Sequence, residues 1–172
     1  MADAQTLNRL LRTCARSALH LEMRDGYMLD DPMLHQWRAG HRYDPADRAL
    51  WWRPWLDLIA ETTGRGVDVW RARIVSEPVS EYIQFEYDMT FTNLAAGEQV
   101  RWLPRRDATD IALPGNDFWL FDDHTVLVNH FSGDGDWLDT ELLEDAALAR
   151  LCRTAFDAVW TRATPHEAYT PK

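Results

Sequence analysis

The chain has 172 residues, of which 46% are apolar and nine are tryptophan, and its formal net charge is −10. So much apolar surface excludes an intrinsically disordered protein, and the length suits one domain with a single substantial core. The charge is uneven, because residues 1–106 carry a net −1 and residues 107–172 carry −9. An acidic half repels phosphate backbones, so we expect no direct binding to nucleic acid.

The lysine and cysteine content limits the reactions that the chain can catalyse and indicates its cellular compartment. Lys172 is the only lysine, which excludes Schiff-base chemistry at an internal lysine. Cys14 and Cys152 both fall on apolar sides of predicted helices, as free buried thiols do in a reducing cytosol. No apolar run approaches the roughly 18 residues of a membrane span. We therefore expect a cytoplasmic protein that makes no contact with a membrane.

The first predicted element is an amphipathic helix. From Leu7 to Leu19, apolar residues recur at spacings of three and four, which predicts a helix that continues to the region before Gly26. On such a helix His20 and Arg24 would share one face.

Two further helices are predicted before the first strand. A short one covers residues 33–38, and a longer one begins after Asp47 and stops at Gly64. Pro54 should kink this longer helix or begin its second part.

The clearest strand is "VDVWRARIV", residues 67–75, whose alternation places Arg71 and Arg73 on one face. A helix capped by Ser76 should follow, and then a second strand over residues 98–106. A strand–helix–strand unit favours a parallel pair of strands.

The last third of the chain predicts a hairpin and a long helix. Residues 116–131 indicate two strands joined by a tight Asp-Asp-His turn, and residues 148–163 have the strongest helical period. The fold class is therefore α/β, with a mixed sheet of about four or more strands flanked by helices. We expect one domain over residues 1–172, with a helical part, 1–66, packed on an α/β core, 67–165.

Common catalytic and metal-binding motifs are absent. There is no Walker A sequence and no G-x-S-x-G, and "HEAYT" has Thr170 where a zinc protease needs its second histidine. "DGDWLDTELLED", which begins at Asp134, resembles a calcium loop for three positions only. We therefore expect no metal and no cofactor.

Three groups of polar residues remain as candidate sites. The first is His20, Glu22, Arg24 and Asp25, within "HLEMRDGY". These residues suit either a general acid/base or anion site, or an ion-pair network at the end of a helix. We favour the network, which ties the helix to the sheet and forms one rim of a pocket.

The second group is Arg71 and Arg73. Guanidinium groups side by side suit a phosphate or carboxylate ligand. The alternative, which we slightly favour, pairs them internally with Glu77, Glu86 and Glu98.

The third group surrounds the last hairpin and contains Asp117, Asp122 and His130. These side chains could bind a ligand. Hairpin turns collect aspartate and asparagine for backbone reasons alone, however, and we favour that interpretation.

Five segments, in order, are similar to motifs of an actinobacterial family of unknown function: "ALHLEMRDGY", "RARIVSEPVSEYIQFE", "AAGEQVRWLPRR", "PGNDFWLFDD" and "HFSGDGDW". The resemblance covers roughly residues 7–170. It implies a small cytoplasmic protein encoded beside a helix-turn-helix regulator, with a role in developmental or antibiotic-related regulation. It implies no reaction.

The order of elements also resembles one half of a phospholipase-D-like domain. Such domains carry H-x-K-x4-D just before the last hairpin. If Asp122 is the aspartate, Gly115 and Asp117 stand where histidine and lysine belong; if Asp123 is, Asn116 and Phe118 stand there. The resemblance therefore implies a degenerate catalytic fold kept for binding, and pairing into a homodimer.

We expect a non-catalytic regulatory or protein-interaction module whose partner is a helix-turn-helix regulator. The alternative is a small-anion sensor or an enzyme. In that case His20 or His130 would act as acid and base, and Arg71 and Arg73 would hold the anion. The alternative requires these side chains to meet in one pocket.

Overall fold

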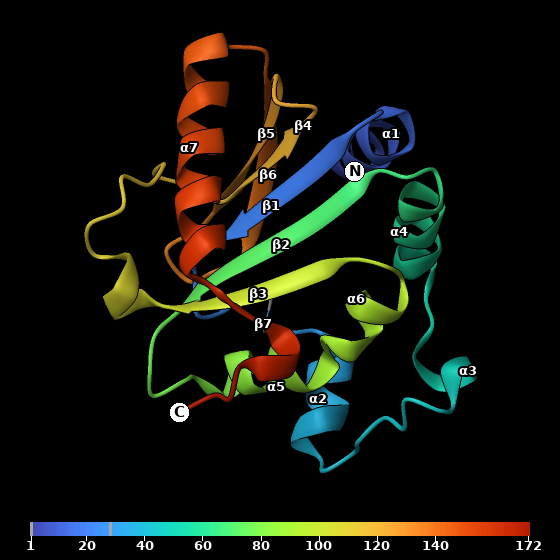
Figure 1. Ribbon diagram of the computed structural model, residues 1–172. Helices are drawn as coiled ribbons and strands as arrows, with labels where there is room; N and C mark the ends of the chain where they lie inside the picture. Colours follow the sequence, from blue (N-terminus) through green and yellow to red (C-terminus); the bar gives the residue numbers. More distant parts are fainter. Residues whose placement is uncertain (1, 28) are drawn as a thin grey trace.

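The computed structural model describes residues 2–27 and 29–172 and contains a seven-stranded mixed sheet with helices on both faces (Figure 1). The strands are β1 Ser17–Glu22, β2 Asp68–Val75, β3 Gln99–Pro104, β4 Phe118–Phe121, β5 Thr125–Phe131, β6 Trp137–Leu143 and β7 Thr164–Pro165. The helices are α1 Ala2–Thr13, α2 Pro32–Arg38, α3 Arg48–Trp51, α4 Pro54–Gly64, α5 Glu81–Met89, α6 Phe91–Ala95 and α7 Ala146–Arg162, with short 3-10 turns at Arg105–Ala108 and His166–Ala168.

The strand order is β6-β5-β4-β1-β2-β3-β7, which places β1 in the centre. β1, β2 and β3 are parallel, whereas β4, β5 and β6 continue the sheet as antiparallel neighbours and β7 is antiparallel to β3. This arrangement confirms the predicted fold class, including the parallel pair formed by β2 and β3.

Alternation along the strands separates two layers. On one face, Leu19, Ala72 and Leu120 pack with Phe156 of α7. On the other face, Val69 and residues of β4 and β5 pack with α1 and α4. Figure 1 shows α7 along one face of the sheet, and α1 and α4 beside each other at a distance from α7.

The predicted first helix was wrong beyond Thr13. Residues 17–22 form β1, which hydrogen-bonds to a strand on each side and has its first five residues buried. A central strand is covered by packing on both faces, so its buried Ala18 and Leu19 satisfied a helical spacing by chance. Residues 1–66 are therefore not wholly helical, and His20 and Arg24 do not share a helix face.

The helix after β2 begins later than predicted. The Ser80 hydroxyl, not that of Ser76, accepts a hydrogen bond from the backbone N–H of Ile83 at the start of α5. The strand β6 was not predicted at all, because it lies at the edge of the sheet and is largely exposed. The helix that starts at Pro54, both strands of the last hairpin and α7 are confirmed.

The two cysteines, Cys14 and Cys152, are free and buried. Within residues 2–27 and 29–172, none of the helices combines the length and apolar character that a membrane crossing requires.

Candidate functional site

A polar network lies on the sheet face opposite α7. In the parallel register of β1 and β2, His20 is opposite Arg71 and Glu22 is opposite Arg73. On the other side of β1, His20 is opposite Trp119 of β4. Side chains two residues apart on a strand share a face, so the register alone gathers these residues.

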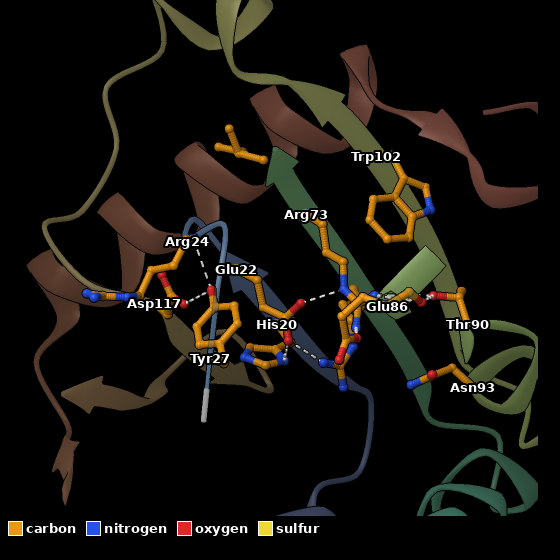
Figure 2. A network of polar contacts seen from close by, with 12 residues as sticks. His20, Glu22, Arg24, Tyr27, Arg73, Glu86, Thr90, Asn93, Trp102 and Asp117 are labelled. Atoms are coloured by element: carbon orange, nitrogen blue, oxygen red, sulfur yellow. Dashed lines mark hydrogen bonds and ion pairs between the residues drawn. The ribbon is translucent and has the colours of Figure 1, made fainter. Parts of the chain in front are cut away.

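Glu22 joins the two arginines of β2. One carboxylate oxygen accepts a hydrogen bond from Arg71. The other accepts one from Arg73 Nε at 2.6 Å (Figure 2). Arg71 also pairs with Glu98 at 2.7 Å, and Arg73 pairs with Glu86 at 2.5 Å. The internal pairing that we favoured for the arginines is therefore present, with Glu22 as an additional partner.

The third expected partner, Glu77, does not reach this network. Its carboxylate accepts a hydrogen bond from the Tyr169 hydroxyl instead.

The network keeps its charges despite burial. Burial alone would raise the pKa of Glu22, but Arg71 and Arg73 outweigh it and hold the pKa well below its usual range. Burial opposes the charge of both arginines, and their glutamate partners outweigh it and raise the pKa of each guanidinium. Because two arginines meet three glutamates, the network has one negative charge in excess and no spare cation.

His20 is buried next to this network, and its ring makes no hydrogen bond to the residues that the structure describes. It is 7% exposed, its ring stacks on Trp119 with centroids 4.2 Å apart, and its buried Nδ1 lies 3.6 Å from a Glu22 oxygen without bonding to it. Burial, with Arg71, lowers the pKa of His20 to about 3. The imidazole is therefore neutral at neutral pH, and within residues 2–27 and 29–172 its buried Nδ1 has no hydrogen-bond partner.

A cavity of about 300 Å³ opens over these side chains. Its lining comes from nine strands and helices and from the loops between them: Leu7, His20, Glu22, Tyr27, Asp31, Arg53, Trp55, Arg71, Arg73, Tyr82, Glu86, Asn93, Asp117, Trp119, Asn129, Phe131 and Trp137. Five of the nine residues singled out in the sequence meet here, which are His20, Glu22, Arg71, Arg73 and Asp117.

Asp117 forms a second polar pair in the same cavity. Its carboxylate accepts a hydrogen bond from the Tyr27 hydroxyl (Figure 2). It also accepts one from the Met23 backbone N–H at 3.0 Å. Burial, with the charge of Glu22, outweighs these bonds and raises the pKa of Asp117 to about 6. Burial and the neighbouring carboxylates raise the pKa of Tyr27, so this phenol stays protonated.

Arg53 is a cavity residue that the sequence did not indicate. Its Nε is buried without a hydrogen-bond partner, and its Nη1 is directed at Met33 Sδ, a weak acceptor, at 2.9 Å. The only signal was its place just before the proline that starts α4, which says nothing of a ligand.

Arg24 and Asp25 lie outside the cavity and tie segments together. Arg24 donates to the Ser132 carbonyl, and Asp25 accepts from the Ser76 backbone N–H at 2.7 Å and from Arg105 at 3.2 Å. Their role is the structural one that we favoured, although at the end of a strand rather than of a helix.

Asp122 and His130 are also outside it. Asp122 lies in the β4–β5 turn at the opposite end of β1, where its carboxylate accepts from the backbone N–H groups of residues 15–17. His130, on β5, pairs with Glu141 at 3.2 Å and is partly exposed. Neither shares the cavity with His20.

Among the side chains that the structure describes, no cluster of three or more histidine, cysteine or carboxylate groups is arranged to hold a metal ion.

The family is decided by the match of a family model to residues 5–171. This chain belongs to the family described as a domain of unknown function, DUF6879. No curated protein matches the chain in sequence.

Solved structures share its fold. NucT from Helicobacter pylori has a TM-score of 0.55 at 11% identity, and Nuc from Salmonella typhimurium, a phospholipase D family member, has 0.52 at 11%; each match covers 94% of this chain and 89% of the other. TrmBL2, an archaeal chromatin protein with a novel mode of DNA binding, has 0.51 at 13%, and the match covers 94% of this chain and 50% of TrmBL2. At these identities the likeness shows a phospholipase-D-like fold alone.

Proposed function

We propose that this member of DUF6879 is a non-catalytic binding module with a regulatory role, and that its cavity takes a small ligand. One observation carries the proposal: His20 is more than nine-tenths buried, lines the cavity and has no hydrogen bond within the described part of the chain. An unsatisfied buried polar group is costly, and a ligand that hydrogen-bonds to it removes that cost.

The state of His20 and of the two arginines of β2 supports binding over catalysis. A histidine with a pKa of about 3 is a weak base at neutral pH, and both arginines of β2 are held by carboxylates. The cavity lining, as far as the structure describes it, has no serine, threonine, cysteine or lysine to act as nucleophile. The phospholipase-D-like pattern also lacks its histidine and lysine, because these positions hold Gly115 and Asp117 in one register, and Asn116 and Phe118 in the other.

We further propose that the module acts through a helix-turn-helix partner in an actinobacterial cytoplasm. The fold matches half of TrmBL2, a DNA-binding chromatin protein, so the same architecture can be part of a larger protein that binds DNA. Because residues 107–172 are strongly acidic, the partner rather than this chain would contact the DNA. The free buried cysteines suit a reducing compartment. A homodimer remains a prediction.

The ligand proposal is tested by thermal unfolding with a panel of small metabolites. A ligand at 100 times its Kd adds about 2.7 kcal/mol of stability, which raises the Tm of a chain of this size by roughly 5–10 °C. The variant His20→Phe keeps the stack on Trp119 but loses the hydrogen bond, so the shift should disappear. His130→Phe, the same change outside the cavity, should keep it. No compound that shifts the wild type, or an equal shift in His20→Phe, would contradict the proposal.

The partner proposal needs a separate measurement. Affinity purification of the tagged chain from its host should recover a helix-turn-helix protein in stoichiometric amount. If only unrelated proteins at low abundance co-elute, this part of the proposal is wrong.

A further inference from the structure

The ligand class follows from the charges that the cavity leaves unmatched. Arg71 and Arg73 are each paired with two carboxylates. Arg53 differs from both, because within residues 2–27 and 29–172 it makes no ion pair and bonds only to the Met33 thioether. A guanidinium is always charged, and one in a partly buried wall is stabilised by an anion.

The surrounding carboxylates limit the charge of that anion. Glu22, Asp31, Glu86 and Asp117 line the same cavity, so a doubly charged phosphate would meet strong repulsion from several sides. A carboxylate carries one charge and matches the planar fork of a single arginine with two parallel hydrogen bonds.

The walls of the cavity limit the shape and polarity of the rest of the ligand. Aromatic side chains provide most of the apolar lining: Tyr27, Trp55, Tyr82, Trp119, Phe131 and Trp137. Trp55 meets the edge of Trp119, with centroids 6.2 Å apart, and Tyr27 meets Phe131 in the same way at 5.1 Å. Flat apolar groups stack well on such walls, and a volume of about 300 Å³ is at the small end of ligand pockets.

We propose that the cavity binds a small aromatic monocarboxylate, with the carboxylate on Arg53, the flat body between the aromatic walls and a polar substituent on His20. This assignment rests on the proposed function, because it names the ligand class of the same cavity. Asn129 also lines the cavity and can help to orient the substituent.

The test compares matched compounds on matched variants. Calorimetric titrations would use 4-hydroxybenzoate, 4-hydroxyphenylacetate, 4-hydroxycinnamate and indole-3-acetate, each with an O–H or N–H group for His20, together with the neutral amide of each and phenyl phosphate. At least one acid should bind the wild type at least tenfold more tightly than its amide and than phenyl phosphate. In the variant Arg53→Ala, the affinity for that acid should fall at least about tenfold, so that the acid and its amide bind equally well. The control variant is Arg48→Ala. Arg48 lies five positions before Arg53, is exposed and stacks on Trp52, so its removal should leave the preference for the acid unchanged.

Folding does not obscure the outcome, since Arg53 has one weak contact and its removal should leave the Tm unchanged. If the amides bind as tightly as the acids, or if Arg53→Ala binds the acids like the wild type, the carboxylate assignment is wrong. A neutral or cationic metabolite that stabilises the wild type through His20 would overturn this assignment and leave the proposed function intact. If no compound of either panel binds, both are wrong.

Discussion

His20 and Trp119 occupy directly paired positions on β1 and β4, and their rings stack at 15° with centroids 4.2 Å apart. The stack holds the imidazole in one orientation at the floor of the cavity. Since burial keeps the ring neutral, it offers a ligand one donor and one acceptor rather than a charge.

The Glu22 carboxylate should be the most important single group for the stability of the polar network. It bonds to both Arg71 and Arg73, which are buried, and its own side chain is only 13% exposed. Glu22→Ala leaves Arg71 paired with Glu98 and Arg73 paired with Glu86, but it removes one charge-assisted hydrogen bond from each guanidinium. This loss should lower the free energy of unfolding by about 3 kcal/mol. Urea denaturation measures this change.

Glu61→Ala is the matched control for that variant. Glu61 pairs with Arg12 at 3.7 Å, and both side chains are more than half exposed. Such a pair contributes about 1 kcal/mol or less. Equal losses in the two variants would mean that the buried network gives the fold no more than a surface pair does.

His20 should make the protein sensitive to acid. Its pKa is about 3 in the folded chain, against 6.5 for the ordinary side chain. The unfolded chain therefore binds the proton first, so stability is lost as the pH falls below about 6.5. Between pH 7 and pH 4 this linkage amounts to roughly 3 kcal/mol. His20→Phe should lose that much less stability than the wild type over the same interval, as measured by denaturant titration at each pH.

Asp117 should change the pH dependence of stability in the opposite direction to His20. Its pKa of about 6 lies above the ordinary 3.8, so the folded chain holds this proton more tightly than the unfolded chain. The contribution to stability is present below pH 4 and is lost as the pH rises through 6. Asp117→Asn cannot ionise, so its stability relative to the wild type should rise by roughly 2 kcal/mol between pH 4 and pH 8. A difference that does not change with pH would show that Asp117 titrates normally.

Asp122 should matter for the turn and not for the cavity. Its carboxylate accepts three backbone N–H groups, and its φ of 51° lies in the left-handed region that aspartate and asparagine tolerate. Asp122→Ala should lower the free energy of unfolding by about 2 kcal/mol, by analogy with lost helix caps, while ligand binding is unchanged. Asp122→Asn keeps one side-chain oxygen as acceptor and tolerates the left-handed backbone conformation, so it should recover part of that loss. Thermal unfolding of the two variants measures the difference.

The predictability of the fold followed the strength of local patterns. β2 alternates over eight residues and α7 repeats over seventeen, so both were found. β1 is short and buried on both faces, and its apolar residues continued the period of the preceding helix. Only its hydrogen bonds to β2 and β4 decide its conformation, and these neighbours lie about 50 and 100 residues away in the sequence.

The candidate site was predictable by residue type but not by arrangement. Charged residues among apolar neighbours, such as Glu22 and Arg73, are unusual enough to stand out in a sequence, although Glu22 was assigned to the end of a helix and not to a strand. Their meeting with Asp117 depends on the order of the strands, which no local pattern contains. Arg53 and Trp55 enter from the start of α4 and carried no signal of their own.

The most direct test of the central claim is a crystal structure of the protein with the compound that stabilises it most in the thermal assay. We predict density for one small molecule in the cavity, hydrogen-bonded to the His20 ring. A cavity that holds only water, or that the protein's own side chains fill, would contradict a ligand-binding role for this site.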